Sequence, residues 1–249
     1  IAEQFSRLGL RGELAAGDYC QLFARTGMAA DQNVVARLGT GFSAQPTVVI
    51  GAHYDTHELT VEGALDNATG VAAMLEVARL AAREEWPFDI VFVAFGSQFN
   101  YPSGAQQFGV GLMSSYNSLA FVELDAVGVP ISGSYGLAAE FGEQPETIGF
   151  VVGYGSPAES REIVASASES SGVATVEVPT YLASSLGMGG DFSTLESYAT
   201  TISFGTGNSP YIHSTQDTVE RVDFDQVERA VGLTMGVLEA LRSDEGTSR

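Results

Sequence analysis

The segment VVIGAHYDT (48–56) constrains the fold more than any other part of the sequence. It follows directly on Thr47, and residues 47–50 form a run of four β-branched side chains, which is typical of a strand covered on both faces of a sheet. Where the run ends, His53 and Asp55 lie two positions apart, so their side chains leave the same face of the strand end. Asp66 follows on a loop. Open α/β sheets place their sites at this position, at the carboxyl end of a strand and before a helix.

Apolar strand-like runs alternate with helical periodicity along the rest of the chain. Strands are expected at 20–23, 33–38, 47–50, 89–95, 120–124, 147–152, 175–178 and 200–204, and helices at 1–10, 70–83, 106–117, 157–171 and 223–242. Ser156 is expected to cap the helix at 157–171, and residues 187–191 are expected to form a polar turn. The alternation predicts an α/β fold, a three-layer α/β/α sandwich around a mixed, mostly parallel sheet. We expect a single domain over residues 1–249.

The charge balance limits the partners of this chain. With 11 basic and 31 acidic residues the net charge is −20, which argues against nucleic acid or an anionic membrane surface as a partner. No segment approaches the roughly 18 to 20 consecutive apolar residues of a membrane span, and no signal peptide is visible at the start. The lone Cys20 can form neither an internal disulfide nor a thiolate metal cluster.

Polar residues with metal-binding chemistry recur at the ends of the predicted strands. One strand end carries His53, the next leads to Gln98, and a third ends at Asp125, while loops carry Asp66 and His213. Imidazoles combined with carboxylates, and without thiolates, suit zinc or a similar divalent ion.

The order of these motifs resembles the co-catalytic two-zinc aminopeptidase family, whose relatives include glutaminyl cyclases. The motifs that carry the resemblance are VVIGAHYDT (48–56), GALDNATGVAAMLEVAR (63–79), VFVAFGS (91–97), VELDAVG (122–128) and HSTQDT (213–218). The likeness covers nearly the whole chain. It implies a peptide or amino-acid-like ligand and favours an extracytoplasmic or secreted location.

The resemblance also implies a role for each matching residue. His53 and Asp125 would hold one zinc ion, Asp66 would bridge two ions, and His213 would bind the second. Asp55 would hydrogen-bond His53 and orient its ring. Tyr211 and Asp191 would lie near the substrate end of the site.

The departure from the family falls on the chemistry. After the strand at 89–95 the family carries two consecutive glutamates, a general base and a ligand of the second zinc, where this chain has Gln98 and Phe99. Gln98 has no titratable proton to exchange, and Phe99 has no lone pair to donate to a metal. We therefore expect one zinc ion or none.

Three interpretations follow. The first is a weakly active or inactive relative of the aminopeptidases. The second is an active one-zinc aminopeptidase or related amide hydrolase with a substitute carboxylate, for which Glu58 and Glu123 are candidates. The third is a non-catalytic module that binds a ligand or a protein. If His213 turned toward the first ion, a closed four-ligand structural site would result.

Overall fold

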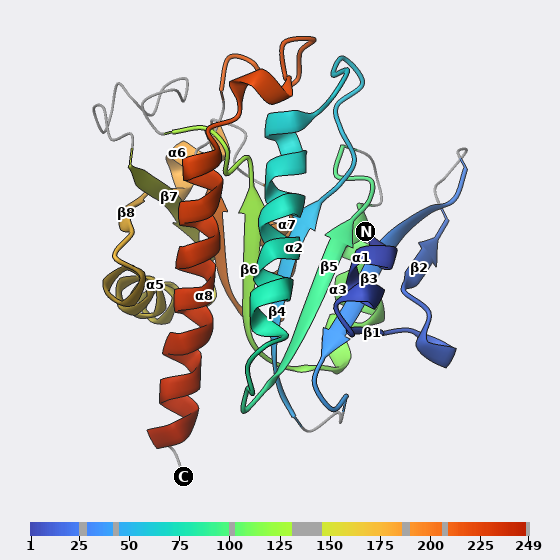
Figure 1. Cartoon of the computed structure of the whole chain (residues 1–249), viewed down its shortest axis with the longest axis vertical. Coiled ribbons are helices and arrows are strands. Elements are labelled where there is room, and N and C mark those ends of the chain that lie inside the picture. Colours follow the sequence, from blue (N-terminus) through green and yellow to red (C-terminus); the bar gives the residue numbers. More distant parts are fainter. Residues whose placement is uncertain are drawn as a thin grey trace.

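The computed structural model describes residues 1–24, 29–41, 45–99, 103–130, 146–185, 190–205 and 209–247. This part of the chain forms a nine-stranded sheet with helices on both faces (Figure 1). The strands are β1 (Arg11–Gly12), β2 (Cys20–Phe23), β3 (Asp31–Leu38), β4 (Pro46–His53), β5 (Asp89–Phe95), β6 (Asn117–Asp125), β7 (Thr147–Val152), β8 (Ala174–Glu177) and β9 (Thr200–Gly205). The α-helices are α1 (Ala2–Arg7), α2 (Thr69–Ala81), α3 (Gly104–Gly111), α5 (Pro157–Ser171), α6 (Thr180–Ser185), α7 (Asp191–Leu195) and α8 (Phe224–Thr247). Short helical turns are η1 (Ala15–Gly17), η2 (Ala64–Ala68), η3 (Met113–Ser115) and η5 (Val219–Arg221).

The four central strands run parallel in the order β5, β4, β6 and β9. Antiparallel partners flank them, with β3 beside β5 and β7 beside β9. Because β4, β5 and β6 are parallel, their carboxyl ends meet at one edge of the sheet. The predicted fold class is confirmed, and the expected site residues are brought to that edge.

The apolar run in β4 is explained by burial on both faces of the sheet. Val48 and Ile50 pack in the core beneath α1, α2, α5 and α8, while Val49 packs in the second core with α3, α6 and α7. Each fully buried side chain of this size contributes about 1.5–3 kcal/mol. Among the described residues, no helix has the length and apolar character that crossing a membrane requires.

Three local expectations need correction. The helix expected at 106–117 begins earlier, because Ser103 and Gln106 form a capping box, and it ends at Gly111, so that Asn117 already belongs to β6. Ser156 precedes α5 without making a side-chain capping hydrogen bond. In the expected turn at 187–191, Asp191 instead begins α7, and residues 187–189 lie outside the described ranges.

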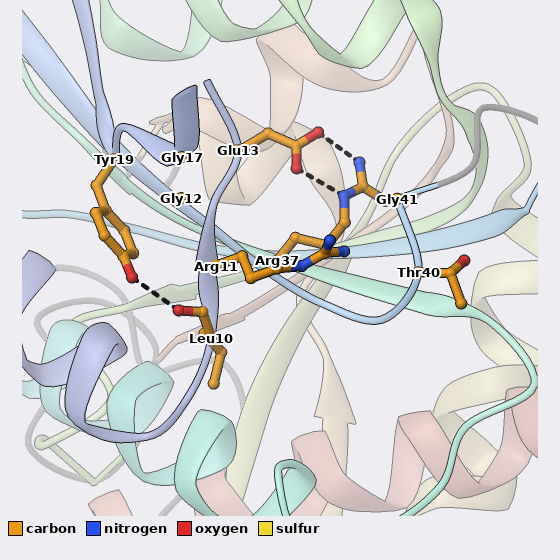
Figure 2. Close-up of a pocket in the computed structure, with 9 residues that line it drawn as sticks. All are labelled: Leu10, Arg11, Gly12, Glu13, Gly17, Tyr19, Arg37, Thr40 and Gly41. Atoms are coloured by element: carbon orange, nitrogen blue, oxygen red, sulfur yellow. Dashed lines mark hydrogen bonds and ion pairs between the residues drawn. The ribbon is translucent and has the colours of Figure 1, made fainter. Parts of the chain in front are cut away.

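A buried ion-pair network joins the segment after β1 to the start of β5. Figure 2 shows the part of this network formed by Glu13 and Arg37. Arg37 on β3 donates to both carboxylate oxygens of Glu13 at 2.6 Å and to Asp89 at 2.8 Å. Glu13 and Arg37 line a pocket of about 490 Å³ together with Arg11, Tyr19 and neighbouring residues. Asp89 begins β5, whereas Gln98 follows its end, so this pocket lies away from the carboxyl edge of the sheet.

Candidate metal centre

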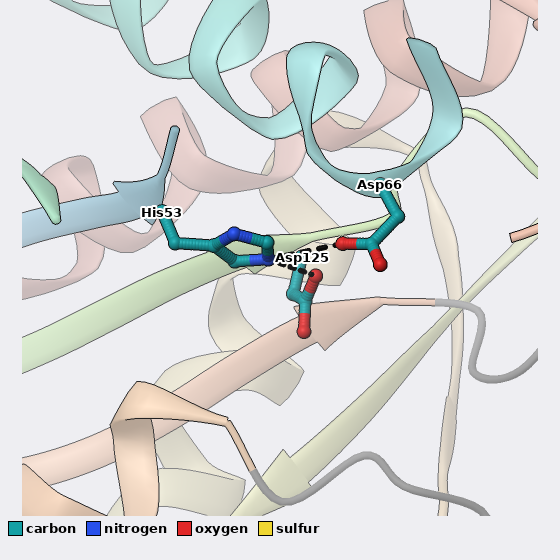
Figure 3. A group of neighbouring side chains, drawn as sticks. All are labelled: His53, Asp66 and Asp125. Carbon is teal, nitrogen blue, oxygen red and sulfur yellow. Dashed lines mark ion pairs between the residues drawn. The ribbon is translucent and has the colours of Figure 1, made fainter. Parts of the chain in front are cut away.

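Three potential metal ligands converge at the carboxyl edge of the sheet (Figure 3). His53 ends β4, Asp125 ends β6, and Asp66 comes from the η2 turn that leads into α2. The Nε2 atom of His53 lies 3.0 Å from Oδ1 of Asp66 and 3.4 Å from Oδ1 of Asp125. One ligand atom from each of the three residues lies within 4.8 Å of the other two. Parallel strand ends thus bring together the residues that the sequence pattern singled out.

Asp55 meets the opposite side of the His53 ring, although differently from the expectation. Its backbone carbonyl oxygen lies 3.0 Å from Nδ1 of His53, whereas its carboxylate lies at 3.7 Å. The carboxylate accepts the backbone N–H groups of Gln98 at 3.0 Å and Phe99 at 3.5 Å. The main chain of Asp55 therefore orients the imidazole, and its side chain fixes the loop after β5.

The η2 turn that presents Asp66 is held by side chains from distant parts of the chain. Asp217 accepts the backbone N–H groups of Leu65 at 2.6 Å and Asp66 at 3.2 Å. The buried Asn67 donates to the carbonyl of Leu124 on β6 and accepts the N–H groups of Gly70 and Ala126. These bonds fix Asp66 relative to the end of β6.

His213 lies on the other side of Asp66. Its Nε2 atom is 2.9 Å from Oδ2 of Asp66, so the two carboxylate oxygens of Asp66 face two different histidines. His213 does not belong to the three-residue ligand group within the described ranges. The closed four-ligand arrangement considered from the sequence therefore differs from the geometry of this structure.

The Phe99 ring lies among the histidines of the site. Its centroid is 5.6 Å from that of His53, 5.5 Å from that of His57 and 5.3 Å from that of His213, each with nearly perpendicular planes. His57 also stacks on His213 with 4.9 Å between ring centroids. Sequence reasoning missed His57, although the chain has only three histidines and this one follows His53 by four positions.

A second group of polar side chains lies behind Gln98 and is almost fully buried. With its amide oriented to satisfy its neighbours, the Gln98 nitrogen donates to Oδ1 of Asp191 at 2.6 Å and to Oδ2 at 3.1 Å. Glu123 accepts the Ser203 hydroxyl at 2.6 Å and the N–H of Phe192 at 3.2 Å. Asp191 is only 2% exposed. It is therefore a partner of Gln98, and its contact with a ligand stays a prediction.

The charges at this edge shift one another's pKa values. Burial alone would lower the pKa of His53, but the carboxylates of Asp125, Asp55 and Asp66 raise it well above its usual value. Burial would raise the pKa of Asp66, yet His213 and His53 lower it well below its usual range. Burial, and then the charge of Asp125, raises the pKa of Glu123 to about 7. Such opposed shifts are typical of functional sites.

Strained backbone also gathers at this edge. Three residues, Ser97, Ala126 and His213, have positive φ angles of 59°, 50° and 55°. Residues other than glycine rarely adopt this region of backbone conformation. Ser97 precedes Gln98 and Ala126 follows Asp125. Each such residue costs of order 1–3 kcal/mol, and such strain clusters at active sites and ligand clamps.

The remaining expectations concern the periphery of the site. Tyr211 is half-buried with the guanidinium carbon of Arg221 3.7 Å from its ring centroid, and its contact with a ligand stays a prediction. Glu58 is exposed on the loop after β4. Residues 131–145 and 186–189 lie outside the described ranges.

Residues 33–237 match the model of peptidase family M28. The chain belongs to peptidase family M28. The match covers most of the sequence and includes the three ligand candidates and His213, so the resemblance inferred from the motifs is confirmed. Family membership also accounts for the order of the motifs along the chain.

Curated relatives match shorter stretches of this M28 chain. An uncharacterized protein of Escherichia coli (strain K12), YfbL, is 39% identical over 74 residues, which is 27% of this chain and 22% of that protein. A probable zinc metalloprotease of Pyrenophora teres f. teres is 34% identical over 103 residues, 38% of this chain and 22% of that protein. The matched region thus spans 22% of the length of each of these relatives.

Solved structures share the fold. The LapA aminopeptidase of Legionella pneumophila superposes with a TM-score of 0.74 at 18% identity, covering 97% of this chain and 63% of that one. The zinc aminopeptidase BSAP of Bacillus subtilis superposes with a TM-score of 0.64 at 19% identity, covering 84% of this chain and 49% of that one. The glutaminyl cyclase of Porphyromonas gingivalis superposes with a TM-score of 0.68 at 19% identity, covering 96% of this chain and 86% of that one. At these identities the likeness establishes the α/β architecture.

Proposed function

We propose that this M28 chain holds one zinc ion, binds a peptide or amino-acid-like ligand and hydrolyses amide bonds weakly or not at all. The observation that carries the proposal is the pair of contacts made by Gln98 and Phe99. The Gln98 amide is bound to Asp191, and the Phe99 ring lies among three imidazoles. Neither supplies a carboxylate, and the family resemblance places a carboxylate at both positions.

The residues present fit one ion. Zinc binds nitrogen and oxygen ligands at about 2.0–2.2 Å, so tetrahedral ligand atoms lie roughly 3.3–3.6 Å apart. The observed separations of 3.0 Å and 3.4 Å between His53 and the two carboxylates are near this range. His53, Asp66 and Asp125 would therefore hold the ion and leave a position open. A zinc ion so bound would polarise a carbonyl oxygen and acidify water.

A second ion would find too few ligands in the described part of the chain. Asp66 Oδ2 and His213 Nε2 face each other at 2.9 Å, and Phe99 has no donor atom to add. A stable zinc site generally needs at least three protein ligands. We infer that the second site of the family is lost, and that His213 instead supports Asp66 through a hydrogen bond.

A second candidate function is amide hydrolysis with Glu123 in the role of the base. Its carboxylate precedes Asp125 on β6, and burial followed by the charge of Asp125 raises its pKa to about 7, a range suited to a general base. Against this role, the carboxylate is 1% exposed and is already bonded to Ser203 and to the Phe192 N–H.

The ligand class and location extend the proposal. A net charge of −20 disfavours nucleic acid, whereas the carboxylates at the site suit the ammonium group of an amino acid or peptide. We also propose an extracytoplasmic or secreted location, on the family resemblance.

Zinc stoichiometry and turnover test the proposal together. After loading and removal of excess metal, elemental analysis is expected to give one zinc per chain, with anilide hydrolysis about 10²–10⁴-fold below that of an enzyme with a positioned base. Asp66→Asn should lose the zinc, whereas the surface control Asp18→Asn should keep it. Two zinc ions per chain with turnover of about 1–10³ s⁻¹ would overturn the proposal.

Asp217→Asn is expected to weaken zinc binding although Asp217 is not a ligand. The asparagine keeps one acceptor oxygen for the two N–H groups that Asp217 now binds, so the Asp66 turn loses part of its support. Loss of such an outer partner typically lowers metal affinity about 10–100-fold. Competition with a chromophoric chelator measures the change, and the exposed neighbour Glu220→Gln is the control. An unchanged zinc affinity in Asp217→Asn would contradict the anchoring role.

A further inference from the structure

His57 is the histidine of this site that makes no ion pair or hydrogen bond with Asp66 or Asp125 among the described residues. Its ring stacks on His213 with 4.9 Å between centroids and an interplanar angle of 27°. The ring also meets Phe99 at 5.5 Å with an interplanar angle of 89°. The chain has only three histidines, and all three therefore lie around Phe99.

A backbone contact favours one neutral tautomer of His57. The N–H of Leu59 donates to Nδ1 of His57 at 3.2 Å. A nitrogen that accepts a hydrogen bond carries no hydrogen, so the neutral ring must carry its hydrogen on Nε2. Nε2 lies across the ring from Nδ1 and so points away from the Leu59 backbone. His57 thus offers an N–H donor, and metal ligation by Nε2 would require another tautomer.

Four other side-chain donors of the site are already engaged within the described part of the chain. Nε2 of His53 and Nε2 of His213 face Asp66. The Gln98 amide nitrogen faces Asp191, and the Ser203 hydroxyl donates to Glu123. A site rich in carboxylates can accept hydrogen bonds from an ammonium group but has few donors for a carbonyl oxygen. Nε2 of His57 makes no hydrogen bond to a described residue, so it can serve this need.

We propose that His57 is a positioning residue whose Nε2–H donates a hydrogen bond to a carbonyl or carboxylate oxygen of the peptide-like ligand, which rests on the function proposed above. The same loop continues with Leu59 and Val61, whose side chains are 61% and 77% exposed. These exposed apolar side chains would suit a ligand that carries an apolar side chain beside its amide or carboxyl group.

The tautomer can be measured without zinc or ligand, so this part of the test is independent of the proposed function. Long-range ¹H–¹⁵N correlation spectra of the whole chain are expected to show the Nε2–H pattern for His57, assigned by its loss in His57→Phe. The pattern should persist after zinc is added. An Nδ1–H pattern, or a zinc-induced shift of the His57 nitrogens typical of a metal ligand, would overturn the proposal.

Binding of L-leucinamide to the zinc-loaded protein, followed by calorimetry, tests the donor itself. His57→Phe keeps an aromatic ring beside His213 but removes the N–H, and is expected to weaken binding about 3- to 10-fold, as for one neutral hydrogen bond. The zinc content should stay unchanged. The surface control Asp18→Asn should leave both the zinc content and the affinity unchanged.

The outcomes separate the two proposals. Equal affinity in His57→Phe, loss of zinc from that variant, or no binding of L-leucinamide to the unaltered protein would each overturn the role of His57. Rapid hydrolysis of the amide would contradict the weak activity proposed above, while the measured tautomer would still support the donor.

Discussion

Replacing Gln98 and Phe99 together by glutamate is expected to add a second zinc ion and to raise anilide hydrolysis by at least about 10²-fold. Phe99→Glu would place a carboxylate near Asp66 and His213, whose facing atoms are 2.9 Å apart. Gln98→Glu would restore a group that can take up and release a proton. Elemental analysis and initial rates on amino-acid anilides measure the two effects.

The single variants are the controls for this gain. Phe99→Glu alone should bind more zinc with little added turnover, and Gln98→Glu alone should keep one zinc. Two zinc ions in the double variant without a rate increase would show that the missing base is not what limits the reaction.

Asp191 complicates the Gln98→Glu change. The Gln98 nitrogen lies 2.6 Å from an Asp191 oxygen, and a glutamate there would place two carboxylates in contact, so one of them would hold a proton to higher pH. Adding Asp191→Asn restores a pair of one amide and one carboxylate at positions 98 and 191. Comparing the rates with and without this change separates the repulsion between the two carboxylates from the effect of the restored base. The side chain at position 98 and its partner at position 191 therefore form one unit.

The second large effect concerns stability: Asp89→Ala is expected to lower the free energy of unfolding by about 3–5 kcal/mol. Asp89 accepts the Arg37 guanidinium and the N–H groups of Thr40 and Gly41, each at 2.8 Å. It is almost fully buried, so its removal leaves two amides and part of a buried cation without acceptors. Urea unfolding measures the loss as a lower midpoint with an unchanged m value.

A matched control separates burial from charge. Glu76 pairs with Arg79 on the exposed face of α2, and Glu76→Ala should change the urea midpoint far less, because exposed ion pairs contribute little. The urea midpoint of Asp89→Asn, which keeps one acceptor oxygen, should lie between those of Asp89→Ala and Glu76→Ala. Equal midpoints for Asp89→Ala and Glu76→Ala would contradict the structural role of the network.

Much of the site could be predicted because its ligands occur at strand ends. The β-branched run at 47–50 predicts a buried strand, and parallel strands bring their carboxyl ends to one edge, so His53 and Asp125 meet without knowledge of the loops between them. The bounds of the helix expected at 106–117 were wrong: the Ser103–Gln106 pair is a capping-box signal in the sequence that hydrophobic periodicity alone overlooks, and the helix ends at Gly111.

The sequence by itself determined the α/β class, the identity of the ligand candidates and the presence of an amide and a phenyl ring at positions 98 and 99, because strand periodicity and residue chemistry are local properties. Only the tertiary structure decided that Asp191 lies against Gln98, that Asp217 holds the Asp66 turn and that His57 stacks on His213. These contacts are made by residues on loops and at the ends of helices, where the sequence has no hydrophobic periodicity to predict the path of the chain. Which of these groups meet is therefore decided by side-chain packing in the folded chain.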